Sequence, residues 1–447
     1  MKKYYTIFLV VTALFFLWAA WQTRLVLDQD RKQQNRASSV QTADTPPLVV
    51  LTTVALGGFR GLLVDILWIR LISLQKEGKV FEIAQLADWI TKLEPQFTAV
   101  WAFHAWNMAY NISILYPNPE HRWLWVKNGI QLLRDNALKY NPDDPILYRE
   151  LGWLYQHKIG QTWDDMHVYY KLKLALEMNE LFAGPGLDYP KPDSKSEKIQ
   201  KMRAEYKLLP EIMRAIEQDY GRLDWRLPET HAVYWAYRGL HEAARGKDTS
   251  ACDHMLFQSM AAAFRQGRLF MDPNVFTYIT TPRLDLLSGA LKAYEDAIKR
   301  QKNDIFRSAY VNFLAEAVFI LHAYGDDRQA QKLFDKMLSE EPRLQSQVSF
   351  EKYIHDCEQF DIAELSIPDA IARIEGLLYQ SCRPSSNYSK TDQNELREKA
   401  LRLWKQYSGN SKNRKYSEIF PPFALIDEQA QQRARDCKEA DPRFAPQ

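Results

Sequence analysis

Apolar residues recur with helical spacing over residues 81–160. The first stripe has the spacing i, i+3, i+4, i+7 and i+10, typical of one face of a helix, and consists of Ile83, Leu86, Ala87, Ile90 and Leu93. Pro95 should end this helix, because the residue before a proline is disfavoured in the α region. A second predicted helix then carries its apolar face on Trp101, Ala105, Met108, Ala109 and Ile112.

This pattern occurs twice, at an offset of 47 residues. Pro95 returns as Pro142, Trp101 as Tyr148, Ala105 as Gly152, and Ile112 as Ile159; upstream, Ile83 and Leu86 return as Ile130 and Leu133. Repeats of this length indicate stacked helix pairs, in which no unit can bury its apolar face alone. The sequence therefore predicts an all-α chain.

The repeated unit resembles the tetratricopeptide repeat, with a helix A, a proline-marked turn, and a helix B carrying a small residue where helices cross. An aromatic residue precedes the small one by four positions at Trp101/Ala105, Tyr148/Gly152 and Trp235/Gly239. We place the closest helix approach at Gly152. The family's unit has about 34 residues, and we assign much of the excess to a longer loop over residues 113–120. The resemblance implies a right-handed α-solenoid of stacked helix pairs.

The pattern also divides the chain. We assign residues 48–181 to the first repeats, 182–223 to an insertion loop and a charged helix, 224–345 to further repeats, and 346–447 to an irregular helical cap and tail. Predicted helices cover residues 162–178, 198–220, 305–324, 330–338 and 392–407, and Pro228 should open a third unit. No sustained alternation of apolar and polar residues predicts strands.

The N-terminus predicts a membrane anchor. Residues 1–3 form a short basic tail, residues 4–22 an apolar span of bilayer length, and residues 23–47 a polar linker. A cleaved signal peptide is the alternative, but Trp18 occupies position −3 of the best cleavage site, after Ala20. Lys2 and Lys3 favour a cytoplasmic N-terminus although Arg24 and further cations oppose it. We expect a single-pass inner-membrane protein with its bulk in the periplasm of a Gram-negative cell.

A second apolar stretch, residues 48–74, contains Arg60, Asp65 and Arg70. A charge near the membrane centre costs about 2.5–3.5 kcal/mol on insertion scales. We therefore interpret this stretch as a buried first helix of the solenoid rather than a second span.

Composition and motifs argue against several classes of binding site and active site. A net charge of +2 gives no electrostatic footprint for nucleic acid. The four cysteines lack a C-x-x-C spacing, which disfavours zinc and leaves three complete disulfide pairings open. Asp164, Asp165 and His167, with His157, are interpreted as a polar junction between repeats. Neither H-E-x-x-H nor a nucleophile or phosphate motif occurs. We expect no enzyme activity, metal or cofactor.

Two sets of polar residues are candidates for binding. Tetratricopeptide arrays line their concave groove with helix A, so the resemblance places the groove on Gln85, Asp88, Trp89, Lys92, Asn128, Gln131, Asp135 and Asn136. A second polar stripe, at i, i+3 and i+7 opposite the packing face of helix B, consists of His104, Asn107 and Asn111. Buried, these three would need hydrogen-bond partners; exposed, they could meet a ligand.

These features predict a membrane-anchored, non-catalytic scaffold or adaptor that binds another envelope protein. The first alternative is a cell-wall glycan-binding or glycan-processing protein, which an isolated acidic residue in a deep aromatic groove would favour. The second is an accessory subunit of an envelope transport complex. Uncovered apolar surface near residues 48–74 would favour that reading.

Overall fold

The computed structural model describes residues 22, 59–182, 197–272, 277–341, 348–383, 389–409 and 420–440. The chain divides into two compact units, Met1–Ile66 with Lys92–Glu94, and Leu67–Thr91 with Pro95–Gln447. The predicted tail (1–3), linker (23–47) and, except for residue 22, membrane anchor (4–22) lie outside the described residues. So do residues 183–196 of the predicted insertion and the last seven residues. The features below belong to the second unit unless stated otherwise.

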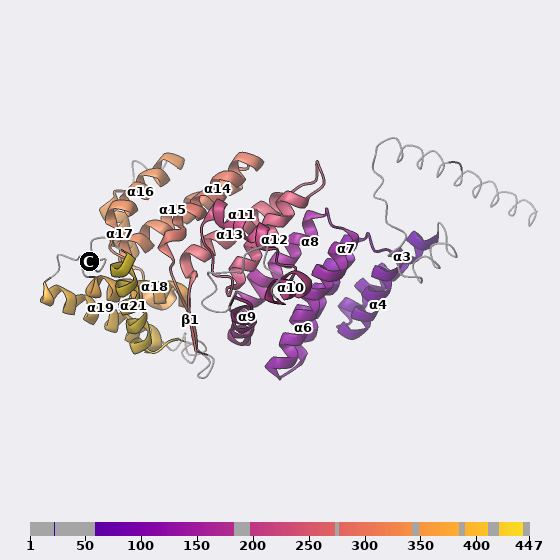
Figure 1. The fold of residues 1–447 in the computed structure, drawn as a ribbon, viewed down its shortest axis with the longest axis horizontal. Helices are drawn as coiled ribbons and strands as arrows, with labels where there is room; N and C mark the ends of the chain where they lie inside the picture. Colours follow the sequence, from indigo (N-terminus) through magenta and orange to yellow (C-terminus); the bar gives the residue numbers. More distant parts are fainter. Residues whose placement is uncertain are drawn as a thin grey trace, which may run out of the picture. The chain divides into compact units, whose positions relative to one another are not determined.

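The described residues are predominantly helical, which confirms the all-α class (Figure 1). The first helices are α3 (Phe59–Lys76), α4 (Val80–Leu93), α5 (Thr98–Trp106), η2 (Asn107–Ile112), η3 (Ser113–Leu115), α6 (Pro119–Gln131), η4 (Leu132–Ala137), α7 (Leu138–Tyr140), α8 (Pro145–Trp153), η5 (Leu154–Ile159), α9 (His167–Phe182), α10 (Glu197–Lys201), η6 (Met202–Tyr206) and α11 (Pro210–Tyr220). The later elements are α12 (Pro228–Glu242), α13 (Ser250–Gln266), β1 (Arg268–Asp272), β2 (Thr277–Thr281), η8 (Leu284–Leu286), α14 (Leu287–Gln301), α15 (Asp304–Ala323), α16 (Asp327–Glu340), α17 (Phe350–Gln359), η10 (Ile362–Glu364), α18 (Ile367–Cys382), α19 (Lys390–Gly409) and α21 (Phe423–Ala440).

The 47-residue repeat is present in three dimensions. The helix formed by α5 and η2 spans residues 98–112, and the one formed by α8 and η5 spans residues 145–159, so both ends recur at the predicted offset. Trp101 Nε1 donates to the Pro95 carbonyl at 2.8 Å, and Tyr148 OH donates to the Pro142 carbonyl at 2.7 Å. The aromatic residue of each helix B therefore ties that helix to the proline turn before it.

The excess length of the unit lies in helices rather than in the predicted loop. Residues 119–140 form one continuous helical run, and Pro119 and Glu120 already belong to its first turn. Asn118 caps this helix by accepting hydrogen bonds from the backbone of Glu120 and His121. The segments η2, η4 and η5 are π-helical, with i→i+5 hydrogen bonds that admit additional residues.

Helix α12 begins at Pro228, where we predicted that a third unit opens, and it packs against α8 and α13. The closest helix approach, however, is not at Gly152. A Cβ on Gly152 would lie 3.4 Å from the Ala232 carbonyl oxygen, whereas a Cβ on Gly239 would lie 2.6 Å from Cys252 Sγ and 2.9 Å from Tyr148 Cβ. The tightest contact between these helices thus involves the small residue of the third unit.

Two further expectations were wrong. Arg268–Asp272 and Thr277–Thr281 form an antiparallel hairpin in which Phe270 pairs with Ile279. The two short strands were missed because neither shows sustained alternation. The predicted helix over residues 198–220 is broken, because Lys207 adopts a left-handed conformation (φ 52°) and Pro210 starts α11.

The helices predicted over residues 305–324, 330–338 and 392–407 are confirmed as α15, α16 and α19. Among the described residues, α15 is the one helix long and apolar enough to cross a membrane by composition. It packs against α14, α16 and α18 and buries Phe313, Leu314 and Leu321, so it is a core helix of this unit.

The first solenoid helix is not buried as predicted. In the part of α3 that belongs to the second unit, Leu71 and Leu74 are buried, but Ile69 is 69% exposed and Ile72 36% exposed. Helix α4 exposes Phe81 as well. Apolar side chains therefore remain uncovered in this stretch.

Candidate functional site

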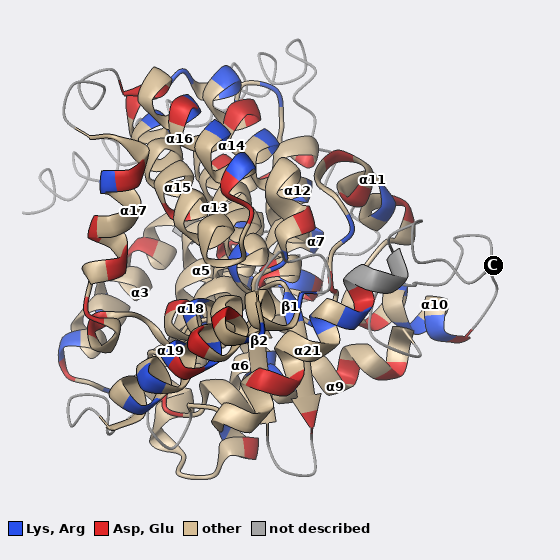
Figure 2. Cartoon of the chain, turned by 90° about the vertical axis from the view of Figure 1, so that its left-hand side faces the viewer, with Lys and Arg blue, Asp and Glu red and all other residues tan. Residues whose placement is uncertain are grey.

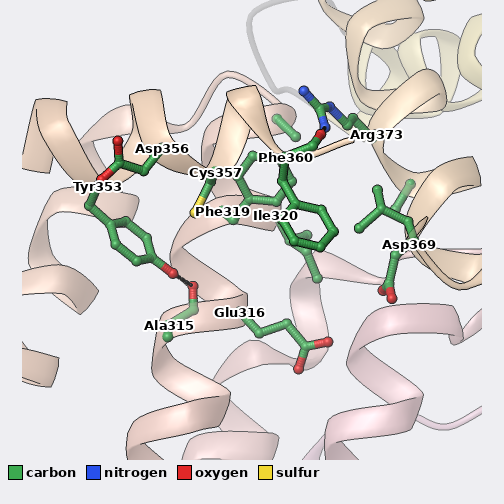
Figure 3. A pocket seen from close by; sticks show the side chains of 13 residues that line it. Ala315, Glu316, Phe319, Ile320, Tyr353, Asp356, Cys357, Phe360, Asp369 and Arg373 are labelled. Carbon is green, nitrogen blue, oxygen red and sulfur yellow. Dashed lines mark hydrogen bonds between the residues drawn. The ribbon is translucent and has the colours of Figure 1, made fainter. Parts of the chain in front are cut away.

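An open apolar pocket of about 430 Å³ lies between α15, α17 and α18 (Figure 3). Each helix contributes one stripe with helical spacing. The stripe on α15 consists of Ala315, Glu316, Phe319, Ile320 and Ala323, and the one along and just after α17 consists of Tyr353, Asp356, Cys357 and Phe360. Helix α18 contributes Asp369, Ala372 and Arg373, and Leu365 comes from the connection between α17 and α18. Three helices thus supply an apolar floor with a few charged groups at the edge.

Hydrogen bonds hold α17 at a fixed position over α15. Tyr353 OH donates to the Ala315 carbonyl at 2.8 Å. The Arg373 guanidinium donates to the Phe360 carbonyl at 3.0 Å and to the carbonyl of Glu358. The end of α17 is therefore fastened to α18, which keeps the pocket open between them.

The charged groups of the pocket are mostly engaged within the protein. Glu316 accepts two hydrogen bonds from Arg265 Nη1, at 3.0 and 2.8 Å, and burial raises the pKa of Glu316 although Arg265 opposes the shift. Asp369 accepts a hydrogen bond from Ser366 Oγ at 2.5 Å. Burial also raises the pKa of the Cys357 thiol, so Cys357 is uncharged at neutral pH and is not an activated nucleophile.

A second cavity, of about 450 Å³, adjoins the first and is more polar. The two share Glu316, Leu365 and Asp369 as a common wall. Lys171 lines the polar cavity, 3.4 Å from His167 Nδ1, and burial lowers the pKa of Lys171 to about 8. This cavity offers hydrogen-bonding groups beside the apolar pocket.

Two ionisable groups that line these cavities are uncharged or engaged within the protein. Cys357 is protonated, and Glu316 is committed to Arg265. Among the described residues, no group of three or more His, Cys, Asp or Glu side chains is placed to hold a metal ion. The cysteines at 252, 357 and 382 are free thiols.

The eight predicted groove residues differ in exposure, and of these eight only Gln131 lines one of the cavities described here. Gln85, Lys92, Gln131 and Asn136 are exposed, Trp89 is 49% exposed, and Asp88, Asn128 and Asp135 are half-buried. Gln131 lines a cavity of about 70 Å³ with the neighbouring Arg134. Asp135 is bound by Arg134 at 2.7 Å. The groove on helix A stays a prediction.

We had predicted that the second polar stripe lies opposite the packing face of its helix, and this prediction was wrong. His104 and Asn107 are buried and Asn111 is half-buried. Asn107 Nδ2 donates to the Val80 carbonyl, and Asn111 Nδ2 donates to Asn107 Oδ1, both at 3.0 Å. Burial lowers the pKa of His104 to about 4. The stripe serves internal packing, since its amides join helix B to the start of α4.

The acidic cluster after the second repeat forms an ion-pair junction, as interpreted from the sequence. Asp164 accepts a hydrogen bond from the buried Lys158 at 2.5 Å, and Arg122 pairs with Asp165 at 2.5 Å. His157 takes no part in these ion pairs; its Nδ1 lies 2.9 Å from the hydroxyl of Tyr110, the residue 47 positions before it, and Lys158 Nζ lies 5.0 Å from the centre of that tyrosine ring.

Sequence reasoning missed the apolar pocket completely. Its α17 stripe lies in the stretch assigned to an irregular cap, although Tyr353, Cys357 and Phe360 follow helical spacing and could have indicated an apolar face. What this face meets depends on how α17 packs against α15 and α18, and the spacing within α17 contains no information about that packing.

The chain matches no protein-family model and no curated protein. The resemblance to tetratricopeptide repeats therefore rests on the residues, helix bounds and hydrogen bonds described above.

Proposed function

We propose that this protein is a membrane-anchored, non-catalytic helical-repeat adaptor that binds a partner protein in the bacterial envelope. The observation that carries the proposal is the apolar pocket between α15, α17 and α18. An open pocket of about 430 Å³ can accept one or two large apolar side chains of a partner. Such anchoring side chains dominate the binding energy of many protein interfaces.

The repeats support the same proposal. Helix bounds and proline-turn hydrogen bonds recur at the 47-residue offset. Stacked helix pairs arranged as a right-handed α-solenoid would be a tetratricopeptide-like scaffold, and solenoids commonly offer extended surfaces to partners. We extend the proposal to residues 4–22 as an inner-membrane anchor and to a periplasmic location for the rest of the chain.

The glycan-binding or glycan-processing alternative would need an isolated acid in a deep aromatic groove. Glu316 lies beside Phe319 in the pocket, but it is held by Arg265 rather than isolated. We therefore retain the adaptor as the better proposal.

An accessory subunit of an envelope transport complex is the second candidate, and one specific observation favours it. Ile69 and Ile72 of α3 and Phe81 of α4 are exposed. Exposed apolar side chains close together in the chain are typical of surfaces that contact another protein or a membrane. This surface would dock the adaptor onto a membrane-embedded partner.

Filling the pocket tests the adaptor proposal. Ala315→Leu adds three carbon atoms to the pocket wall, whereas Ser308→Leu adds a similar apolar group at an exposed position of the same helix. Partners are crosslinked in intact cells and recovered with the full-length protein. We expect the wild type and Ser308→Leu to retain a common partner and Ala315→Leu to lose it at unchanged thermal stability. Retention by a stable Ala315→Leu variant would contradict the proposal.

Localisation has its own test. Alkaline phosphatase fused after Gln447 should be active, and a reporter that fluoresces only in the cytoplasm should be dark there. The opposite pair of results would place the bulk of the chain in the cytoplasm.

A further inference from the structure

We propose that the segment bound in this pocket is cationic as well as apolar: one large apolar side chain fills the pocket, and a Lys or Arg beside it faces the carboxylates at the rim. This inference rests on the proposed adaptor function and adds the chemistry of the partner.

The positive charge of the pocket is bound by backbone carbonyls at the end of α17. Arg373 is its one cation among the lining residues and is buried. Its guanidinium donates to the carbonyls of Glu358 and Phe360 and lies 5.7 Å from the centre of the Phe319 ring. A guanidinium committed to carbonyl groups and an aromatic face is poorly available to an acidic ligand.

The carboxylates, in contrast, are at the end and rim of the pocket. Figure 3 shows the carboxylates of Glu316 and Asp369 at the same end, with Asp356 on the α17 side. Arg265 compensates Glu316, while Asp356 is exposed and Asp369 half-buried. Asp369 is close enough to act as a like charge on Glu316, which contributes to the raised pKa of Glu316 after burial itself. The rim therefore carries negative charge that a cation could compensate.

The segment that runs from α17 into the first turn of α18 is also acidic. Residues 356–369 contain no Lys or Arg, against the acids Asp356, Glu358, Asp361, Glu364 and Asp369. Figure 2 shows red positions along α17. Lys399 pairs with Glu358 of this segment at 3.0 Å and Gln406 donates to Asp361 at 3.0 Å, so these two acids already have partners in the protein. Complementary charge raises association rates and selects among apolar partners.

The apolar lining of the pocket is the reason to expect a large apolar side chain in the ligand. Phe319, Ile320 and Phe360 belong to its walls, and burying one large apolar side chain there would provide most of the affinity. An acyl chain could also enter such a pocket, but the acidic rim repels the head groups of anionic lipids. A peptide that combines Leu or Phe with Lys or Arg matches both features.

The first experiment selects ligands without assuming a sequence. Full-length protein in lipid nanodiscs is used to select displayed random 12-residue peptides, and enriched sequences are compared with the unselected library. We expect enrichment of Leu, Phe or Trp together with Lys or Arg within three positions. Enrichment of apolar residues with neutral or acidic neighbours would overturn the inference and leave the adaptor function intact. Failure to enrich any peptide would overturn both.

The second experiment locates the bound peptide. Cys357 lines the pocket, so an enriched peptide should slow its alkylation by N-ethylmaleimide, whereas Cys382, outside the pocket, should react at an unchanged rate. Equal rates at Cys357 with and without saturating peptide would place binding elsewhere. Protection of Cys357 by phosphatidylcholine vesicles but not by peptide would identify a lipid as the occupant and also overturn the inference.

A matched pair of variants tests the rim charge. Asp356→Asn removes a carboxylate that lines the pocket, and Glu351→Gln removes one from the same helix outside it. Exposed ion pairs correspond to about a twofold to fivefold change in affinity. We expect Asp356→Asn to weaken the basic peptide by about that factor in fluorescence anisotropy and Glu351→Gln to leave it unchanged. Equal effects of the two variants, or none from Asp356→Asn, would contradict the role of the rim.

Discussion

Replacing Gly239 by Ala tests the contact at which α12 crosses its neighbours. The added Cβ would lie 2.6 Å from Cys252 Sγ on α13 and 2.9 Å from Tyr148 Cβ on α8. Non-bonded carbon atoms prefer separations of about 3.5–4.0 Å, so at least one helix has to move. Because a Cβ atom is fixed to its backbone, the Tyr148 contact cannot be relieved by a rotamer change.

Two opposing effects determine how much Gly239→Ala changes the free energy of unfolding. Ala is favoured over Gly inside a helix by about 1 kcal/mol. Overpacking a well-packed interior costs about 1–3 kcal/mol, and contacts with two helices place Gly239 near the upper end. We therefore expect Gly239→Ala to lower the free energy of unfolding by about 1–2 kcal/mol.

Gly152→Ala is the matched control. Its Cβ would lie 3.4 Å from the Ala232 carbonyl oxygen and 3.4 Å from Met255 Cγ, and the flexible methionine can adjust. Helix propensity and crowding should then nearly cancel, leaving stability within about 0.5 kcal/mol of the wild type. Urea unfolding followed by far-ultraviolet circular dichroism compares the two variants.

A second-site change identifies which contact matters. In a Cys252→Ala background the Sγ atom is absent, so Gly239→Ala should cost less than in the wild-type background, which a double-mutant cycle measures. Equal stability of Gly239→Ala and Gly152→Ala would refute the reasoning, because it would show that the crossing is loose enough to accept a methyl group at either glycine.

Three further predictions concern the repeats. Tyr148→Phe removes the hydroxyl that bonds the Pro142 carbonyl at 2.7 Å and lies 2.6 Å from Glu242 Oε2; we expect a loss of about 1–3 kcal/mol in urea unfolding, and an unchanged midpoint would mean that the repeated hydrogen bond adds no stability. Burial lowers the pKa of His104 to about 4 in the folded protein, so between pH 6.5 and pH 4 this histidine is protonated in the unfolded chain but not in the folded one. The free energy of unfolding therefore decreases as the pH is lowered below 6.5. Lowering the pH from 7 to 5 should reduce the free energy of unfolding by about 2 kcal/mol through this histidine. If a His104→Phe variant lost the same stability over this pH range, His104 would not be the cause. Trp89→Ala combined with Lys92→Ala should leave thermal unfolding nearly intact, since Trp89 is 49% exposed, and should strip a partner if helix A lines a binding groove; unfolding by this pair would show that Trp89 is a core residue.

Helical periodicity determined the local structure of the repeats. The stripes at Ile83–Ile90 and Trp101–Ile112 predicted the buried faces of α4 and helix B, and the 47-residue offset predicted that both ends of helix B would recur. Prolines at 95, 142 and 228 marked helix boundaries because a proline restricts the backbone locally. Such features depend on residues within a few positions of one another, so the sequence contains them directly.

Sequence spacing alone could not decide where helices meet most closely. Gly152 and Gly239 have the same spacing from an aromatic residue, yet only Gly239 faces both Cys252 on the next helix and Tyr148, which is far from it in the chain. The polar stripe from His104 to Asn111 could have been buried or exposed on sequence grounds, and the structure binds its amides to the start of α4 and to each other. Burial of a polar side chain depends on which backbone group happens to lie opposite it.

The apolar pocket is a property of the tertiary structure. Its walls come from Phe319 on α15, Cys357 on α17 and Arg373 on α18, three helices whose stripes are each ordinary in the sequence. Only their packing leaves a volume unfilled between them and brings Arg373 to the Phe360 carbonyl while Asp356 stays exposed. A sequence specifies which faces are apolar, because that depends on local spacing; whether two such faces close on each other or leave a cavity depends on contacts between residues distant along the chain.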